Sequence, residues 1–178
     1  MTPSLDQYPW FGIASGPDLQ QGDILEDCPV FEPETASLDG SNDRASFTWE
    51  ERSVIVLTQS CDLVAGRKTS HVLLCALWRL SDFAPGHPLS NPKDLEEVRR
   101  GNRPGFHMLG PCQQRGFSEK TRLVDFRRTW SLPLEFLRRQ AQSRLHLRLL
   151  PPYREHLSQG FARFFMRVGL PSDISPFR

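Results

Sequence analysis

The chain has 178 residues, with 22 Lys and Arg against 21 Asp and Glu, and 38% of its residues are hydrophobic. This length predicts one domain, 1–178, with a core large enough to fold without disulfides, and the composition excludes collagen-like, coiled-coil and largely disordered chains. No apolar run approaches the roughly 20 residues of a membrane span, and the first residues lack the pattern of a signal peptide. We therefore expect a cytoplasmic protein that has no membrane partner.

Strand patterns dominate up to about residue 127. Residues 1–20 contain three prolines and two glycines, which predicts an irregular arm. Strands are expected at 21–25, 28–31, 47–51, 53–58, 71–78, 105–109 and 122–126. These stretches are rich in β-branched residues or alternate apolar and polar residues with period two. The run 53–58 is continuous and apolar, which predicts a strand buried on both faces. Residues 32–45 are acidic and small and predict a hairpin loop.

Helical patterns follow in the basic segment 128–178, which we expect to be mainly helical. A short helix over 93–100 precedes this segment, and a second is expected at 134–141 directly after Pro133. Residues 145–150 are ambiguous between strand and helix. A last helix is expected from Tyr153 to Val168, ended by Gly169. Together these elements predict an α+β fold: a small, mostly antiparallel, barrel-like sheet from about 21–127 with C-terminal helices packed on it.

Charge is segregated along the chain although the net charge is only +1. Residues 1–100 hold 8 Lys or Arg and 16 Asp or Glu, whereas residues 101–178 hold 14 and 5. Such asymmetry indicates either a polyanionic partner or two halves that attract each other. Nineteen of the 22 cations are Arg, whose planar fork suits phosphate groups, although a GC-rich genome would also favour Arg.

Clustered arginines in the last third are the candidate nucleic-acid-binding residues. Clustered Arg neutralises phosphates, and a neighbouring Trp130 could stack on a base. The candidates are Arg138, Arg139, Arg154, Arg163 and Arg167. RNA or DNA is the partner that this pattern predicts. The alternative is a solvated helix face that complements the acidic half of the chain.

Cys61 and Asp62 follow the strongest predicted strand, where rigid scaffolds often present chemistry. Cys61 could act as a nucleophile if His71 or His107 lowers its pKa; the alternative is a small buried Cys beside a turn-forming Asp. A metal site would have to use Cys61, Cys75, His107 and Cys112, which are scattered and contain no Cys-x-x-Cys pair. We therefore expect no metal, no cofactor and four free thiols.

Two stretches resemble the PemK/MazF-like toxin family over about residues 21–80. They are Gly22-Asp23-Ile24 and Arg52-Ser53-Val54-Ile55-Val56-Leu57-Thr58, followed by a second apolar strand. The resemblance implies an SH3-like barrel with C-terminal helices, the endoribonuclease activity of a toxin–antitoxin system, and a catalytic role for Arg52. Two departures concern the activity: Ser53 stands where the family has Pro, and Leu77-Trp78-Arg79 stands where it has a catalytic Thr or Ser.

Three functions follow from these observations. The leading one is a nucleic-acid-interacting module of PemK-like fold, either a degenerate endoribonuclease or a regulatory subunit. The second is a cysteine- or metal-dependent hydrolase centred on Cys61, Asp62 and His107. The third is an accessory subunit that binds a protein partner through its acidic loop or its basic helix.

Overall fold

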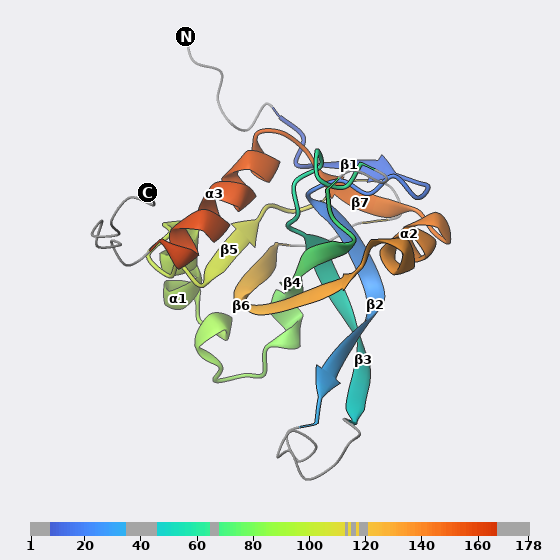
Figure 1. Cartoon of the computed structure of the whole chain (residues 1–178). Helices are drawn as coiled ribbons and strands as arrows, with labels where there is room; N and C mark the ends of the chain where they lie inside the picture. Colours follow the sequence, from blue (N-terminus) through green and yellow to red (C-terminus); the bar gives the residue numbers. More distant parts are fainter. Residues whose placement is uncertain are drawn as a thin grey trace, which may run out of the picture.

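The computed structural model describes residues 8–34, 46–64, 68–112, 114, 117 and 121–166. Seven antiparallel strands form one sheet in the order β1-β7-β2-β3-β4-β6-β5, and α-helices pack on it (Figure 1). The strands are β1 (Phe11–Ala14), β2 (Asp23–Pro33), β3 (Phe47–Val56), β4 (His71–Arg79), β5 (Phe106–Leu109), β6 (Arg122–Pro133) and β7 (His146–Leu149). The helices are α1 (Pro92–Arg99), α2 (Leu134–Gln142) and α3 (Tyr153–Phe165), with 3₁₀ turns η3 (Leu80–Asp82) and η4 (Pro88–Ser90). The predicted α+β class with a mostly antiparallel sheet is confirmed.

The structure differs from the predicted elements in the N-terminal arm, around Leu147, and in β6, which runs to Pro133 beyond the predicted strand 122–126 into the segment predicted to be mainly helical. The N-terminal arm contributes a regular strand, because Phe11 pairs with Leu149 and the rest of β1 continues this ladder along β7. The ambiguous segment around Leu147 is that strand, β7, so sheet pairing decides between two local patterns of similar strength. Both α2 and α3 begin where the prolines predicted. The predicted end of the last helix, Val168 and Gly169, and most of the predicted loop 32–45, from residue 35 on, lie outside the described residues.

The sheet is buried on both faces, and each face has its own helix. Val54 and Val56 belong to one core cluster with Leu137 of α2, whereas Ile55 belongs to a second with Leu157 of α3. Successive side chains of a strand point to opposite faces, so the continuous apolar run of β3 fills both cores, as predicted. It follows that α2 and α3 cover opposite faces of the sheet, and Figure 1 shows them on opposite sides of the strands. Among the helices of the described residues, none is long and apolar enough to cross a membrane.

The sheet is open, so it is barrel-like only in a loose sense. Its edge strands are β1 and β5. Residues beside the two edges nevertheless meet: Trp10 packs against Gly110, and the side-chain amide of Gln114 donates to the carbonyl of Phe11 at 3.0 Å. Trp10 is also stacked on Tyr153 of α3, with ring centroids 3.6 Å apart. These contacts draw the ends of the sheet together beneath α3.

Replacing Gly110 with alanine is expected to destabilise the protein by about 1–3 kcal/mol, the usual cost of overpacking. A Cβ at this position would lie 2.6 Å from Nε1 and 2.8 Å from Cδ2 of Trp10. The indole would have to leave its stacked position on Tyr153. Urea unfolding followed by tryptophan fluorescence measures the loss. Gly12→Ala is the control, since a Cβ at Gly12 would meet nothing closer than Leu150 Cδ2 at 3.4 Å, an ordinary contact; a loss at Gly110 no larger than this control would contradict the packing.

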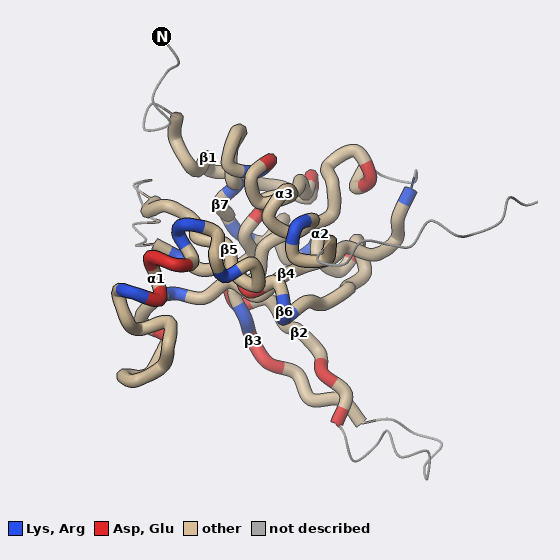
Figure 2. Tube along the Cα trace, turned by 90° about the vertical axis from the view of Figure 1, so that its left-hand side faces the viewer, with Lys and Arg blue, Asp and Glu red and all other residues tan. Residues whose placement is uncertain are grey.

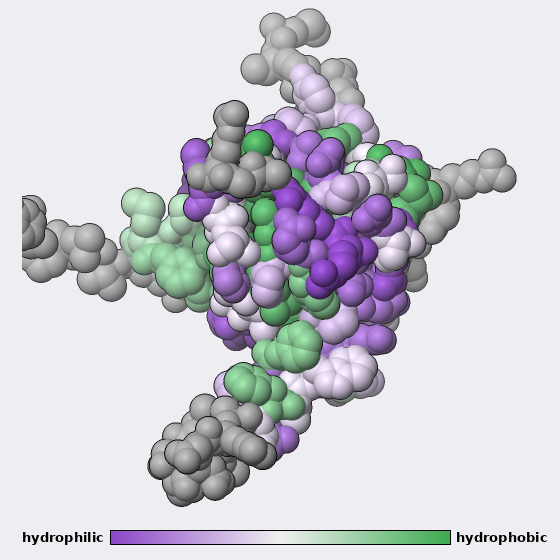
Figure 3. Space-filling model, turned by 45° about the vertical axis from the view of Figure 1, so that its right-hand side comes forward, coloured by the Kyte–Doolittle hydropathy of each residue, from purple (hydrophilic) through white to green (hydrophobic). Residues whose placement is uncertain are grey.

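Beyond a bulge between Leu25 and Cys28, β2 and β3 leave the sheet as a two-stranded hairpin. Phe31 and Trp49 are Cα partners in this hairpin, and Phe47 lies on the same face of β3 as Trp49. These side chains are 46%, 63% and 60% exposed, respectively. Figures 1 and 3 show the hairpin projecting at the lower end of the molecule, with hydrophobic atoms on its surface.

Candidate functional site

The acidic and basic halves of the chain pair with each other through β2. Carboxylates of β2 bind arginines from β6, from β7 and from the turn before β7, so charges of both signs lie along these strands (Figure 2). The pairs are Asp23–Arg148, Glu26–Arg122, Asp27–Arg144 and Glu32–Arg128. Of the two interpretations of the charge segregation, attraction between the halves therefore accounts for these four arginines.

Asp23 is the most deeply buried of these carboxylates, with none of its surface exposed. Burial by itself would raise its pKa, but the hydrogen bonds from Arg148, at 2.5 and 2.9 Å, and the neighbouring imidazole of His146 outweigh burial and leave the pKa below its ordinary value. Nε2 of His146 lies 3.3 Å from the Asp23 carboxylate. This cluster joins the start of β2 to β7, and we interpret its role as stabilising the fold.

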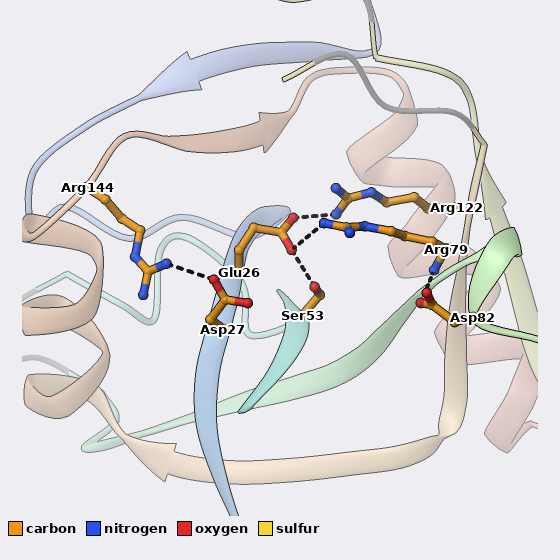
Figure 4. A network of polar contacts seen from close by, with 7 residues as sticks. All are labelled: Glu26, Asp27, Ser53, Arg79, Asp82, Arg122 and Arg144. Carbon is orange, nitrogen blue, oxygen red and sulfur yellow. Dashed lines mark hydrogen bonds and ion pairs between the residues drawn. The ribbon is translucent and has the colours of Figure 1, made fainter. Parts of the chain in front are cut away.

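Glu26 organises a second network, at the bulge of β2 (Figure 4). Its carboxylate accepts hydrogen bonds from Ser53 Oγ and from Nη1 of Arg122, the latter at 2.5 Å, and Nη2 of Arg79 lies 3.9 Å away. A polar cavity of about 170 Å³ opens beside it, where β3 diverges from β4. Carboxylates and arginines balance one another here, which leaves little net attraction for a phosphate group.

Arg52, the candidate catalytic arginine, lies in the wall of this small cavity. Both its Nε and its Nη2 donate to the carboxylate of Glu50 at 2.6 Å, and these hydrogen bonds hold the pKa of Glu50 below its ordinary range. The guanidinium also lies over the ring of Trp78, 5.3 Å from its centroid. The guanidinium of Arg52, to which the resemblance assigns a catalytic role, is therefore already bound to the carboxylate of Glu50 and lies against the indole of Trp78.

Cys61 and Asp62 lie in an exposed turn after β3. The Cys61 thiol contacts Gln59 Oε1 at 3.8 Å and Asp62 Oδ1 at 3.6 Å, and Asp62 forms an ion pair with Lys68 at 3.0 Å. Within the described ranges, neither His71 nor His107 contacts this thiol. The same ranges hold no group of three His, Cys, Asp or Glu side chains that could bind a metal ion. Burial raises the pKa of Cys75 to about 12, so this thiol is not reactive at neutral pH.

The five arginines assigned to nucleic-acid binding do not form one surface. Arg138 and Arg139 belong to α2 and Arg154 and Arg163 to α3, on opposite faces of the sheet, while Arg167 lies outside the described residues. Arg138 is held by Glu135 and by the carbonyl of Leu63, and Arg154 pairs with Glu155. Arg139 and Arg163 are the two described arginines that are exposed and have no ion pair.

A cavity of about 660 Å³ opens between α1, β5 and α3. This volume is typical of ligand sites, which span roughly 300–1,000 Å³. Its walls include the aromatic rings of Trp10, Phe106 and Phe126, and Arg99, Arg100 and Arg163 also line it. No acidic residue is among the described residues that line it. Glu96 binds both Arg99 and Arg100, at 2.6 and 2.7 Å, and offsets one of the three positive charges at the cavity. The charges around the cavity therefore remain positive in balance, because Arg163 has no such partner among the described residues.

One face of α3 supplies the polar wall of this cavity. His156, Gln159, Gly160 and Arg163 follow the spacing i, i+3, i+4, i+7 and all line it. The apolar face beside this stripe, with Leu157 and Phe161, packs on the sheet. Sequence reasoning found Arg163 and missed His156 and Gln159. The signal that could have found them is this second, polar stripe next to the apolar stripe of the same helix.

His107, on β5, faces this stripe. Gly160 makes the approach possible, because a Cβ there would lie 3.1 Å from Nδ1 of His107. The imidazole stacks near Phe126 with centroids 6.1 Å apart, and its nitrogens have no hydrogen-bond partner in the described part of the chain. Burial, and secondly the charge of His156, lower the pKa of His107 to about 4. A neutral imidazole with unused hydrogen-bonding capacity therefore faces the cavity at pH 7.

A comparison of the chain with models of known protein families finds no match, and a search of curated proteins also finds none.

Proposed function

We propose that the protein binds single-stranded nucleic acid at the cavity between α1, β5 and α3. One observation carries this proposal: a cavity of about 660 Å³ that combines aromatic walls with three arginines and no acidic lining residue among those described. Phosphate groups bind to arginine, and unpaired bases stack on aromatic rings. The volume suits one or two unstacked bases, whereas the bases of a duplex are not free to enter such a cavity.

This site differs from both sites that the sequence suggested. It includes His107 and Arg163, but it lies apart from the exposed turn of Cys61 and from the small cavity of Arg52. The resemblance to PemK/MazF-like toxins stays a prediction, and binding at this cavity does not depend on it. The protein-binding alternative draws its support from the exposed aromatic side chains of the β2–β3 hairpin. That hairpin carries glutamates, so it does not compete for a polyanion.

Replacing Arg163 with glutamine is expected to weaken binding of a 12-nucleotide single-stranded RNA roughly tenfold at low salt, since one charge-assisted hydrogen bond is lost. The slope of log K against log salt concentration should fall by about 0.7, the value for one phosphate on a single strand. Fluorescence anisotropy across a salt series measures both quantities. Because Arg163 is exposed and has no ion pair in the described structure, the fold should be unaffected.

Arg139→Gln is the matched variant, since Arg139 is also exposed and has no ion pair among the described residues, but lies on α2. It should bind as the unmutated protein does. Equal losses in both variants would place binding on both helices instead of at the cavity. Absence of binding by the unmutated protein at low salt would refute the proposed function.

A further inference from the structure

The β2–β3 hairpin is attached to the molecule by one face and open on the other. Cross-strand partners of an antiparallel pair lie on the same face, so Val30 shares one face with Glu50, and Phe31 shares the other with Trp49. Val30 is fully buried and belongs to the core cluster that includes side chains of α2, whereas Phe31 and Trp49 are 46% and 63% exposed. We call the second face the open face; its members are Pro29, Phe31, Pro33, Phe47, Trp49 and Glu51.

The attached face is joined to the sheet by arginines and an indole. Arg128 of β6 binds the carboxylate of Glu32 at 3.2 Å. Arg52, which is bound to Glu50, and Arg128 both place their guanidinium groups over the ring of Trp78 of β4, 5.3 and 5.7 Å from its centroid. The orientation of the open face is therefore set before a partner arrives, and such preorganisation lowers the entropic cost of binding.

Prolines protect the outer edge of the hairpin. Over 28–33, β2 pairs with β3 alone among the described strands. Pro29 and Pro33 lack the N–H groups that a strand added at this edge would need. A partner at this side of the molecule would therefore meet the exposed side chains of the open face instead of extending the sheet along β2.

The charge of the hairpin limits which partner its open face can accept. The described residues of the hairpin, 28–34 and 46–52, hold four glutamates and one arginine. Glu51, on the open face, is exposed and has no ion pair among the described residues. Nucleic acid and the anionic leaflet of a membrane would both be repelled. In a twofold contact between two open faces, glutamates of like charge would also meet.

We propose that the open face binds a segment of a partner protein that carries Lys or Arg beside apolar side chains. The three aromatic rings bury the apolar side chains of this segment, and Glu51 binds one of its cations at the rim of the contact. The inference does not depend on the proposed function, because no residue of the open face lines the cavity between α1, β5 and α3.

The test is a selection of phage-displayed random 12-residue peptides on the immobilised full chain, after which enriched peptides are synthesised and their affinities measured by calorimetry. Enriched peptides should combine apolar residues with Lys or Arg. Trp49→Thr should weaken their binding roughly 30-fold or more, the usual effect of losing a central aromatic contact. Because Trp49 is largely exposed and Thr favours strands, this variant should remain folded, which thermal unfolding checks. Glu51→Gln should weaken binding by up to about fivefold and reduce its dependence on salt.

Ile13→Thr is the matched control, because Ile13 is 46% exposed on β1, at the other end of the molecule from the hairpin (Figure 1). It should bind the peptides as the unmutated protein does. The proposal would be overturned if no peptide were enriched, if enriched peptides lacked basic residues, or if they bound Trp49→Thr as tightly as the unmutated protein. Sedimentation with phosphatidylcholine vesicles, or self-association in the ultracentrifuge, would also overturn it if abolished by Trp49→Thr, because the open face would then contact lipid or a second copy.

Discussion

Replacing Arg148 with methionine is expected to lower the free energy of unfolding by about 3–5 kcal/mol. Arg148 donates two hydrogen bonds to the fully buried carboxylate of Asp23 and one to the carbonyl of Asp18. Methionine fills much of the same volume but leaves a buried charge without its main partner. The cost therefore comes from desolvation of Asp23 more than from the lost attraction. Denaturant unfolding at pH 7 measures it.

Arg144→Met is the control for this change, because Arg144 pairs at 3.2 Å with Asp27, whose side chain is 66% exposed. Exposed ion pairs contribute about 0–1 kcal/mol, so the control should unfold almost as the unmutated protein does. The difference caused by Arg148→Met should also depend on pH. Because the pKa of Asp23 lies below its ordinary value of 3.8, the stabilisation is present above that pH and is lost as the pH falls through the folded value. Equal losses in the two variants would contradict the buried cluster.

Replacing Phe126 with alanine is expected to destabilise the protein by about 3–5 kcal/mol, the usual range for a fully buried phenylalanine. Phe126 is 1% exposed and packs edge-on against Phe161, with centroids 5.4 Å apart, and beside Phe164 at 6.1 Å. It also lines the proposed binding cavity. The variant should therefore lose RNA affinity as well as stability, whereas Phe126→Leu should lose about 1 kcal/mol and keep most of the affinity.

Thermal and urea unfolding, together with anisotropy at a temperature where both variants are folded, separate the two effects. An alanine variant that loses stability but binds RNA normally would show that the ring supports the core without taking part in binding. A loss of stability below about 1 kcal/mol would mean that α3 does not pack on the sheet through this ring.

Local sequence patterns predicted much of the fold. The run 53–58 was identified as buried on both faces because its apolar residues are continuous, and β3 fills both cores. The starts of α2 and α3 were found at Pro133 and Pro152, since proline fits just before or within a first helical turn. The segment around Leu147 could not be assigned, because its pairing with β1 and β2 depends on strands far away in the sequence.

Local sequence patterns could not show which arginines remain unpaired and therefore able to bind a ligand. The arginines of the last third look alike in sequence, but their environments differ. Arg148 is bound to a buried carboxylate, and Arg138 donates to Glu135 and to the carbonyl of Leu63. Arg163 lines the cavity and has no ion pair among the described residues. Strand order sets the partner of Arg148, because it brings the acidic β2 beside β7.

By itself the sequence determined the class of fold, the main strands and helices, and the segregation of charge, because hydrophobic spacing and turn residues act over a few neighbouring positions. Only the tertiary structure decided where a site could form. His107 and His156 belong to elements distant in the chain, and both line one cavity because α3 packs against β5 at Gly160, where the missing side chain allows His107 to approach. The same packing left Cys61 in an exposed turn and Arg52 bound to Glu50. Contacts of this kind depend on how whole elements pack, which no local pattern contains.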